Sequence, residues 1–166
     1  ELQNEFVRSG EIFVKDFKRK HPDTNTLSTT RENSAQPDAW LIMEVATFGN
    51  LSKMYKNLKH QLPQKSAIAN EFGLNLHNEL SSWLESISYL RNIVAHHSRV
   101  WSRTMVKTPM TITHPNYPWL QMPLAKFQAK RPFYVISAML YLCNAVQNDN
   151  LFKIKLLDLF SKYPNI

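Results

Sequence analysis

The chain has 166 residues, of which 43% are hydrophobic, so it can bury one sizeable core, and we expect a single domain over residues 1–166. Its 20 Lys and Arg residues outnumber its 13 Asp and Glu residues, and the resulting formal net charge of +7 favours polyanionic partners, nucleic acid first. A single cysteine, Cys143, excludes a disulfide framework and a cysteine-based zinc site.

The predicted elements are helices, because glycine is scarce (3) and the nine prolines fall between helical patterns rather than inside them. Residues 1–21 carry apolar side chains at mostly helical spacing and predict one helix. Residues 22–37 are polar without an apolar period and predict a loop. Residues 38–62 predict two short helices that join near Gly49.

A short helix is expected over about residues 64–72, with a proline before it and a glycine after it. A long helix should follow, from about Leu76 to His97 or beyond. Residues 109–123 contain four prolines and predict one long irregular loop, long enough to suggest a functional role. A largely buried helix from Pro132 and a final amphipathic helix complete an all-α fold.

The long predicted helix has two faces at 100° per residue. The apolar stripe should pack on the core and comprises Leu76, Leu80, Trp83, Ile87, Leu90, Val94, His97 and Trp101. The opposite side should be exposed and collects Asn78, Ser81, Glu85, Ser88, Asn92, His96, Arg99 and Arg103, with Arg91 on the flank. This spacing favours His97 as a hydrogen-bonded core histidine and Trp101 as a packed side chain, whereas His96 points away from the core.

Spacing alone leaves two interpretations open for the polar residues. His96 is either a solvated surface histidine or a group that acts on a substrate. The arginines form either a solvated basic face or a set of phosphate contacts. A second basic stripe, formed by Lys53, Lys56 and Lys59, is equally consistent with an exposed helix face and with RNA contact.

Other kinds of chemistry fit the sequence poorly. It contains no His-Glu-x-x-His pattern, no Gly-rich phosphate loop and no Gly-x-Ser-x-Gly. Cys143 lies in an apolar run, where its thiol should be inert. The directions of His77, His96 and His97 diverge around the predicted helix, so we expect no metal site, and nothing in the sequence calls for a cofactor.

The stretch "RNIVAH", residues 91–96, has an arginine, a polar residue, three spacers and a histidine, and it resembles the motif of the HEPN superfamily of helical-bundle ribonucleases and nucleotide-binding domains. Two longer blocks are more specific: "PDAWLIMEVATFGNLSKMYKNLK" and "SWLESISYLRNIVAHHSRVWSR" resemble the Abi-like family of bacterial abortive-infection proteins, of AbiD and AbiF type. Ser102 stands where that family commonly has an asparagine. The resemblance implies a HEPN-like helical bundle.

The same resemblance implies an endoribonuclease that pairs two copies of the motif, usually across a homodimer. The reaction would be metal-independent cleavage of RNA, in which the 2′-hydroxyl attacks the adjacent phosphate. His96 is then the candidate general base or acid, because an imidazole suits proton transfer near neutrality. Arg91 is the candidate ligand of the scissile phosphate. Asn92 would orient the imidazole or a phosphate oxygen.

Five further cations are candidate RNA contacts: Arg99, Arg103, Lys107, Lys53 and Lys56. Arg99, Trp101 and Arg103 interleave cations with an aromatic side chain, as single-strand binding grooves do, although the stripe turns Trp101 inward. The alternative function is a non-catalytic HEPN module that binds RNA or a partner protein with the same positive face.

The sequence also indicates where the protein is located and how its activity is restrained. No apolar run approaches the roughly 20 residues that span a bilayer, and the first residues do not resemble a signal peptide, so we expect a cytoplasmic protein without membrane contact. A phage-defence or toxin-type nuclease implies control by an inhibitory RNA or a protein antitoxin. A chain that begins at Glu1 without methionine is compatible with the C-terminal part of a longer protein.

Overall fold

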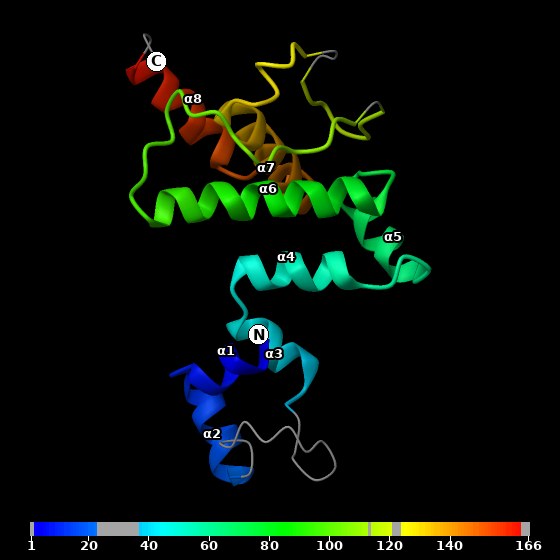
Figure 1. Cartoon of the computed structure of the whole chain (residues 1–166), viewed down its shortest axis with the longest axis vertical. Coiled ribbons are helices and arrows are strands. Elements are labelled where there is room, and N and C mark those ends of the chain that lie inside the picture. The colour runs from blue at the N-terminus through cyan, green and yellow to red at the C-terminus, as the bar shows by residue number, and fades with distance from the viewer. Residues whose placement is uncertain (1, 23–36, 113, 121–123, 164–166) are drawn as a thin grey trace. The chain divides into compact units, whose positions relative to one another are not determined.

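The computed structural model describes residues 2–22, 37–112, 114–120 and 124–163 (Figure 1). Over these ranges the regular elements are helices and no strand forms, which confirms the predicted all-α class. The predicted loop at 22–37 falls almost wholly outside the described residues. The chain divides into two compact units, residues 1–54 and 55–166, and the single domain expected from the sequence stays a prediction.

The first unit contains three short helices and most of a fourth: α1 (Leu2–Arg8), α2 (Ile12–Lys20), α3 (Ala39–Val45) and α4 (Phe48–Asn57). The one helix predicted over residues 1–21 is wrong, because the chain turns at Gly10, a poor helix former. The turn brings the rings of Phe6 and Phe17 edge to face, with centroids 5.6 Å apart. The buried side chains of this unit's core are Phe6, Val14 and Leu41.

The two short helices predicted over residues 38–62 are confirmed as α3 and α4. They meet at Thr47, two residues before Gly49, which lies inside α4. Thr47 Oγ1 accepts the backbone N–H of Asn50 at 3.3 Å, the bond expected of a helix N-cap. The Thr47 N–H in turn donates to Glu5 Oε2 at 2.9 Å. A capping threonine therefore sets the start of α4.

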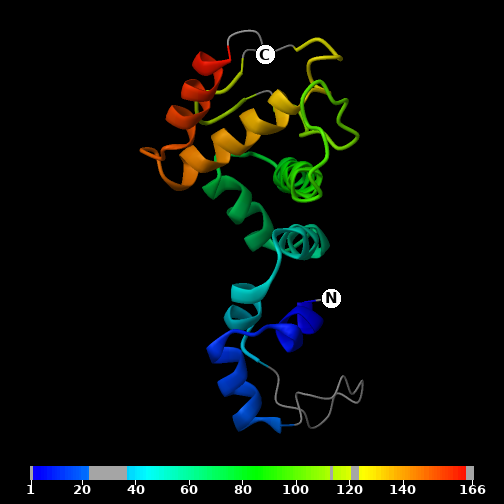
Figure 2. The same ribbon diagram turned by 90° about the vertical axis from the view of Figure 1, so that its left-hand side faces the viewer.

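The second unit consists of the end of α4 and four further helices: α5 (Pro63–Glu71), α6 (His77–Ala95), α7 (Pro132–Val146) and α8 (Phe152–Lys162). Helices α5 and α7 both pack against α6, and α8 packs against α7. Figure 2 looks along α6, whose green coil is seen end-on. The predictions of a short helix at 64–72, a long one after it and two at the end are confirmed.

Helix α6 buries four of the eight residues of the predicted stripe. Its core residues are Leu80, Trp83, Ile87, Leu90 and Ile93. Ile93 continues the stripe in place of Val94, whose side chain is 56% exposed. Leu76 is exposed because it precedes the helix in an extended conformation. Ser81 was expected to face outward and is buried, since α5 and α7 together cover more of α6 than a single stripe.

The segment after α6 returns along that helix. Ser82 Oγ accepts the N–H of Met110 at 2.9 Å, and the Trp83 indole donates to the Met110 carbonyl at 2.8 Å. Ile112 is buried in the core beside them. The described residues of the predicted irregular loop, 109–112 and 114–120, contain no helix. This loop is therefore fastened to the helix that carries the motif.

A buried lysine fixes the end of α4. Lys65 is 1% exposed, and its ammonium donates to the carbonyls of Lys56 and Leu58 at 2.9 and 2.8 Å. These are carbonyls that the end of a helix leaves without partners. Tyr55 donates its hydroxyl to the Lys65 carbonyl at 2.8 Å, and burial raises the pKa of Tyr55 to about 12. The bond from Lys65 to the Lys56 carbonyl holds the backbone of Lys56 close to α5.

Candidate active site at the end of helix α6

Helix α6 ends at Ala95, and the two histidines of the motif lie beyond it. His96 is the C-cap, and His97 adopts a left-handed conformation with φ of 52°. The N–H of His97 donates to the Val94 carbonyl at 2.9 Å, and that of Ser98 to the Ile93 carbonyl at 3.0 Å. This pair of bonds is the Schellman ending of an α-helix, with histidine at the position that glycine usually fills.

The prediction that His97 is a core histidine is therefore wrong. A continuous helix would have carried its side chain onto the buried stripe, but the left-handed turn removes it from the helical path. His97 is exposed, and so is His96. The expectation that His96 points away from the core is confirmed.

Arg91 and Asn92 lie in the last turns of α6, and the backbone N–H of His96, the C-cap, donates to the Asn92 carbonyl at 3.1 Å. All three side chains are exposed, and Arg91 Nη1 donates to Asn92 Oδ1 at 3.2 Å. In the part of the chain that the structure describes, no carboxylate pairs with Arg91 or His96. A guanidinium with most of its five donors unused can bind a phosphate, and an exposed imidazole can accept or donate a proton.

Two of the predicted RNA contacts share one carboxylate. Glu85 binds Lys107 Nζ through Oε1 at 2.7 Å and Lys56 Nζ through Oε2 at 2.9 Å. The hydrogen bond from Lys107, followed by the one from Lys56, lowers the pKa of Glu85 below its ordinary value. The three side chains together carry one positive charge. Both lysines are therefore paired, and their charge is partly neutralised.

This ion cluster lies on the same side of α6 as the motif. Glu85 precedes Asn92 by seven residues, which is two helical turns or about 10 Å along the axis. Lys107 belongs to the segment that returns along α6, and sequence spacing gave no sign that it meets Glu85. Lys53, the remaining predicted lysine contact, is exposed in the first unit.

The arginines that follow the helix flank an exposed tryptophan. Trp101 was expected to pack inward, yet 56% of its surface is exposed, because α6 stops before the stripe reaches it. Arg99 is exposed and Arg103 partly so, and Arg103 Nη1 lies 3.4 Å from the Arg99 carbonyl oxygen. The sequence holds no Asp or Glu between Glu85 and Asp149. This whole stretch is therefore cationic.

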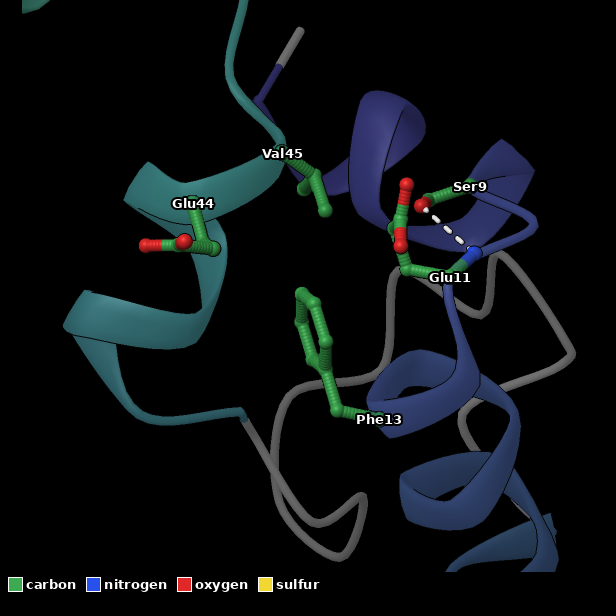
Figure 3. A pocket seen from close by; sticks show the side chains of 5 residues that line it. All are labelled: Ser9, Glu11, Phe13, Glu44 and Val45. Atoms are coloured by element: carbon green, nitrogen blue, oxygen red, sulfur yellow. Dashed lines mark hydrogen bonds between the residues drawn. The ribbon is translucent and has the colours of Figure 1, made fainter.

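A hollow in the first unit is lined by acidic rather than basic side chains. It has a volume of about 400 Å³ and is lined by Ser9, Glu11, Phe13, Glu44 and Val45. In Figure 3 the Phe13 ring points toward Val45, while the Glu44 carboxylate points away from that ring. Two carboxylates at its rim repel phosphate. The hollow contains none of the residues predicted from the motif.

Metal and thiol chemistry gain no support from the geometry. His77 and His96 lie at opposite ends of α6, and the described residues contain no group of three or more His, Cys, Asp or Glu arranged to hold a metal ion. Burial raises the pKa of the Cys143 thiol, which keeps it protonated at neutral pH. Across the same residues, no helix has both the length and the apolar character to span a membrane.

The family of the chain follows from a match over its first 102 residues. The model of the family described as Abi-like protein matches residues 1–102, which include all of α6 together with Arg91, Asn92 and His96. Arg103 and Lys107 lie outside the match. No curated protein and no solved structure matches the chain. Because the match covers more than half of its residues, the chain belongs to the Abi-like protein family.

Proposed function

We propose that the chain is a metal-independent endoribonuclease domain of a bacterial abortive-infection system, of the AbiD/AbiF type and the HEPN superfamily. One observation supports this most directly: Arg91, Asn92 and His96 are exposed together at the end of α6, and no carboxylate among the described residues neutralises them. They lie in the region that matches the family. The net charge of +7 favours an RNA substrate.

The reaction needs no metal because RNA supplies its own nucleophile. The 2′-hydroxyl oxygen bonds to the adjacent phosphorus, the bond to the 5′-oxygen breaks, and the products carry a 2′,3′-cyclic phosphate and a 5′-hydroxyl. His96 takes the proton of the 2′-hydroxyl or supplies one to the leaving oxygen. Arg91 binds the phosphate and offsets the charge of the transition state. Asn92, which accepts a hydrogen bond from Arg91, holds that guanidinium in position.

A second copy of the chain would complete the site. The reaction uses both a base and an acid, whereas the Arg-x4-His motif contributes one histidine, His96, from each chain. Ser88 and Asn92 are short side chains on that side and leave room for a second α6. A two-fold axis beside the helix end would bring two His96 side chains together. We therefore propose a homodimer as the active form.

One observation favours a second candidate function, a non-catalytic module that binds RNA. Glu85 orders Lys56 and Lys107 on the face of α6, and such a pair attracts phosphate without any chemistry. Under this alternative, removal of the Arg91 guanidinium weakens RNA binding in a salt-dependent way, whereas removal of the His96 imidazole leaves binding unchanged. Loss of cleavage with retained binding in His96→Ala would favour the nuclease.

The deciding experiment incubates the protein with a mixed RNA pool in EDTA and identifies the chemistry of the fragment ends. We expect cyclic phosphate ends from the parent protein and a rate lower by about 10²- to 10⁴-fold in His96→Ala, the range of general acid–base catalysis. Arg91→Ala should lose about 10²-fold or more. His97→Gly is the matched control, because it alters the neighbouring exposed histidine and should cut at the parent rate.

Two results would contradict the nuclease mechanism. Cleavage that stops in EDTA and returns with Mg²⁺ would require a metal-dependent reaction. Cleavage that survives in His96→Ala would assign the proton transfer to another group. If the parent binds RNA and never cuts it, even when co-purified components are removed, the binding module is the better description. A nuclease of this kind also needs restraint in its host, and an inhibitory RNA or protein antitoxin is the proposed source.

A further inference from the structure

Trp101 is held at the apex of a fixed reverse turn. The N–H of Arg103 donates to the Val100 carbonyl at 3.1 Å, which closes a four-residue turn. Ser102 is the third residue of that turn and has a φ of 56°, whereas Trp101 before it has no positive φ. Positive φ at the third position alone is the geometry of a type II turn. Trp101 occupies the second position of this turn, and its side chain is exposed there.

Contacts on both sides hold the turn in place. Val100 packs against the main core, and Met105 is 2% exposed with its N–H bonded to the Lys130 carbonyl at 2.8 Å. Arg131 Nη1 donates to the Ser102 carbonyl at 3.0 Å, which supports the left-handed residue. The exposure of Trp101 is therefore a result of the surrounding structure. Trp101 is thus exposed while residues on both sides of it are anchored to the core.

The charges around Trp101 indicate what covers it. Arg99 and Arg103 flank it in the sequence, and no acidic residue occurs between Glu85 and Asp149. A protein surface packed on this turn would have to bring carboxylates to balance the arginines, and a second copy of the same turn would bring more arginines. A nucleotide brings a phosphate for a guanidinium and a flat base for an indole. Such stacking on aromatic side chains is how proteins bind unpaired bases.

We propose that Trp101 is a base-stacking platform and that it selects single-stranded RNA as the ligand of this site. The inference rests on the proposed function, because it gives that ribonuclease its substrate class. A base inside a duplex has both faces covered by its neighbours and offers none to the indole, whereas an unpaired base does. His96 and Trp101 are five positions apart, which is at most about 18 Å of chain, so one short RNA segment can contact both.

The experiment measures binding rather than cleavage, in EDTA and on the His96→Ala background so that the RNA stays intact. The probes are a fluorescein-labelled 12-nucleotide RNA without self-complementarity and the duplex that it forms with its complement. The variants are Trp101→Ala and Trp101→Phe. Trp40→Ala is the matched control, because Trp40 is also largely exposed, on α3 of the first unit.

We expect Trp101→Ala to weaken single-strand binding about 5- to 100-fold, the effect of losing one base–aromatic stack. Trp101→Phe should retain most of the affinity because it keeps an aromatic face. The affinity of Trp101→Ala for the duplex should equal that of the parent, and Trp40→Ala should bind both RNAs with the parent's affinity. The slope of log affinity against log salt should be the same in Trp101→Ala as in the parent, whereas Arg99→Ala should reduce it by about one.

Three results would overturn the inference. Parent-like binding of the single strand by Trp101→Ala would show that the indole contacts no base. An equal loss of duplex affinity in Trp101→Ala would show that the indole contacts RNA without selecting unpaired bases. Dissociation of a parent oligomer by Trp101→Ala, measured by sedimentation, would assign the tryptophan to a protein interface. Failure of the nuclease proposal is distinguishable, because it appears as intact RNA in the cleavage assay while the dependence of binding on Trp101 remains.

Discussion

Replacement of His97 by glycine should make the protein more stable. His97 closes the Schellman ending of α6 with a φ of 52°, a conformation in which its Cβ crowds the backbone. Its side chain is exposed, and among the described residues it makes no hydrogen bond or ion pair that the substitution would remove. The two capping bonds, from the N–H groups of His97 and Ser98, involve only backbone and survive in the variant.

The expected gain follows from two opposing terms. Relief of the left-handed conformation is worth about 1–2 kcal/mol for a residue with a Cβ. The greater conformational freedom of glycine in the unfolded chain costs about 0.5–1 kcal/mol and offsets part of this gain. The free energy of unfolding should therefore rise by about 0.5–1 kcal/mol. For a chain of this length, such a change corresponds to a Tm higher by about 1–4 °C.

Urea denaturation of the parent, His97→Gly and His97→Ala checks this prediction. The alanine variant keeps a Cβ in the left-handed position and should show no gain, so it separates backbone strain from loss of the imidazole. A glycine variant that is less stable than the parent would refute the reasoning and would mean that the histidine side chain stabilises the turn. Loss of RNA cleavage in His97→Gly would show that its exposed imidazole has a function.

Two further substitutions test other parts of the second unit. Gly73 has a φ of +71°, and a Cβ there would approach the Tyr117 ring to 2.5 Å. Gly73→Ala should therefore lower the free energy of unfolding by about 1–3 kcal/mol. An unchanged midpoint of urea denaturation would contradict this. Glu85→Gln should lose up to about 1 kcal/mol at pH 7, because it removes two exposed ion pairs, with Lys56 and Lys107. Since the pKa of Glu85 is lowered on folding, the contribution of Glu85 to stability is complete above the ordinary value of 4.5 and disappears as pH falls through the lower folded value. The free energies of unfolding of the parent and of Glu85→Gln should therefore converge at that low pH. A constant difference between them across pH 3–7 would rule out the ion pairs as its cause.

The sequence by itself determined the features that depend on local spacing. Helical periodicity predicted the all-α class and the core stripe from Leu80 to Leu90, because one face of a helix must be apolar to pack. The "RNIVAH" stretch, with the blocks around it, led to the Abi-like family, which the family match confirms. The roles of Arg91, Asn92 and His96 stay predictions, since shared residue types do not measure chemistry.

The tertiary structure decided where α6 ends and what meets its outer face. Apolar periodicity in the sequence does not indicate where a helix ends. The helix ends where a turn satisfies its last carbonyls and the following residues pack on the core. That ending exposed His97 and Trp101, which a longer helix would have buried. Folding also brought Lys107 to Glu85, a pairing between positions 22 residues apart that no helical period relates. Contacts of this kind arise from packing of the whole chain, and sequence spacing carries no trace of them.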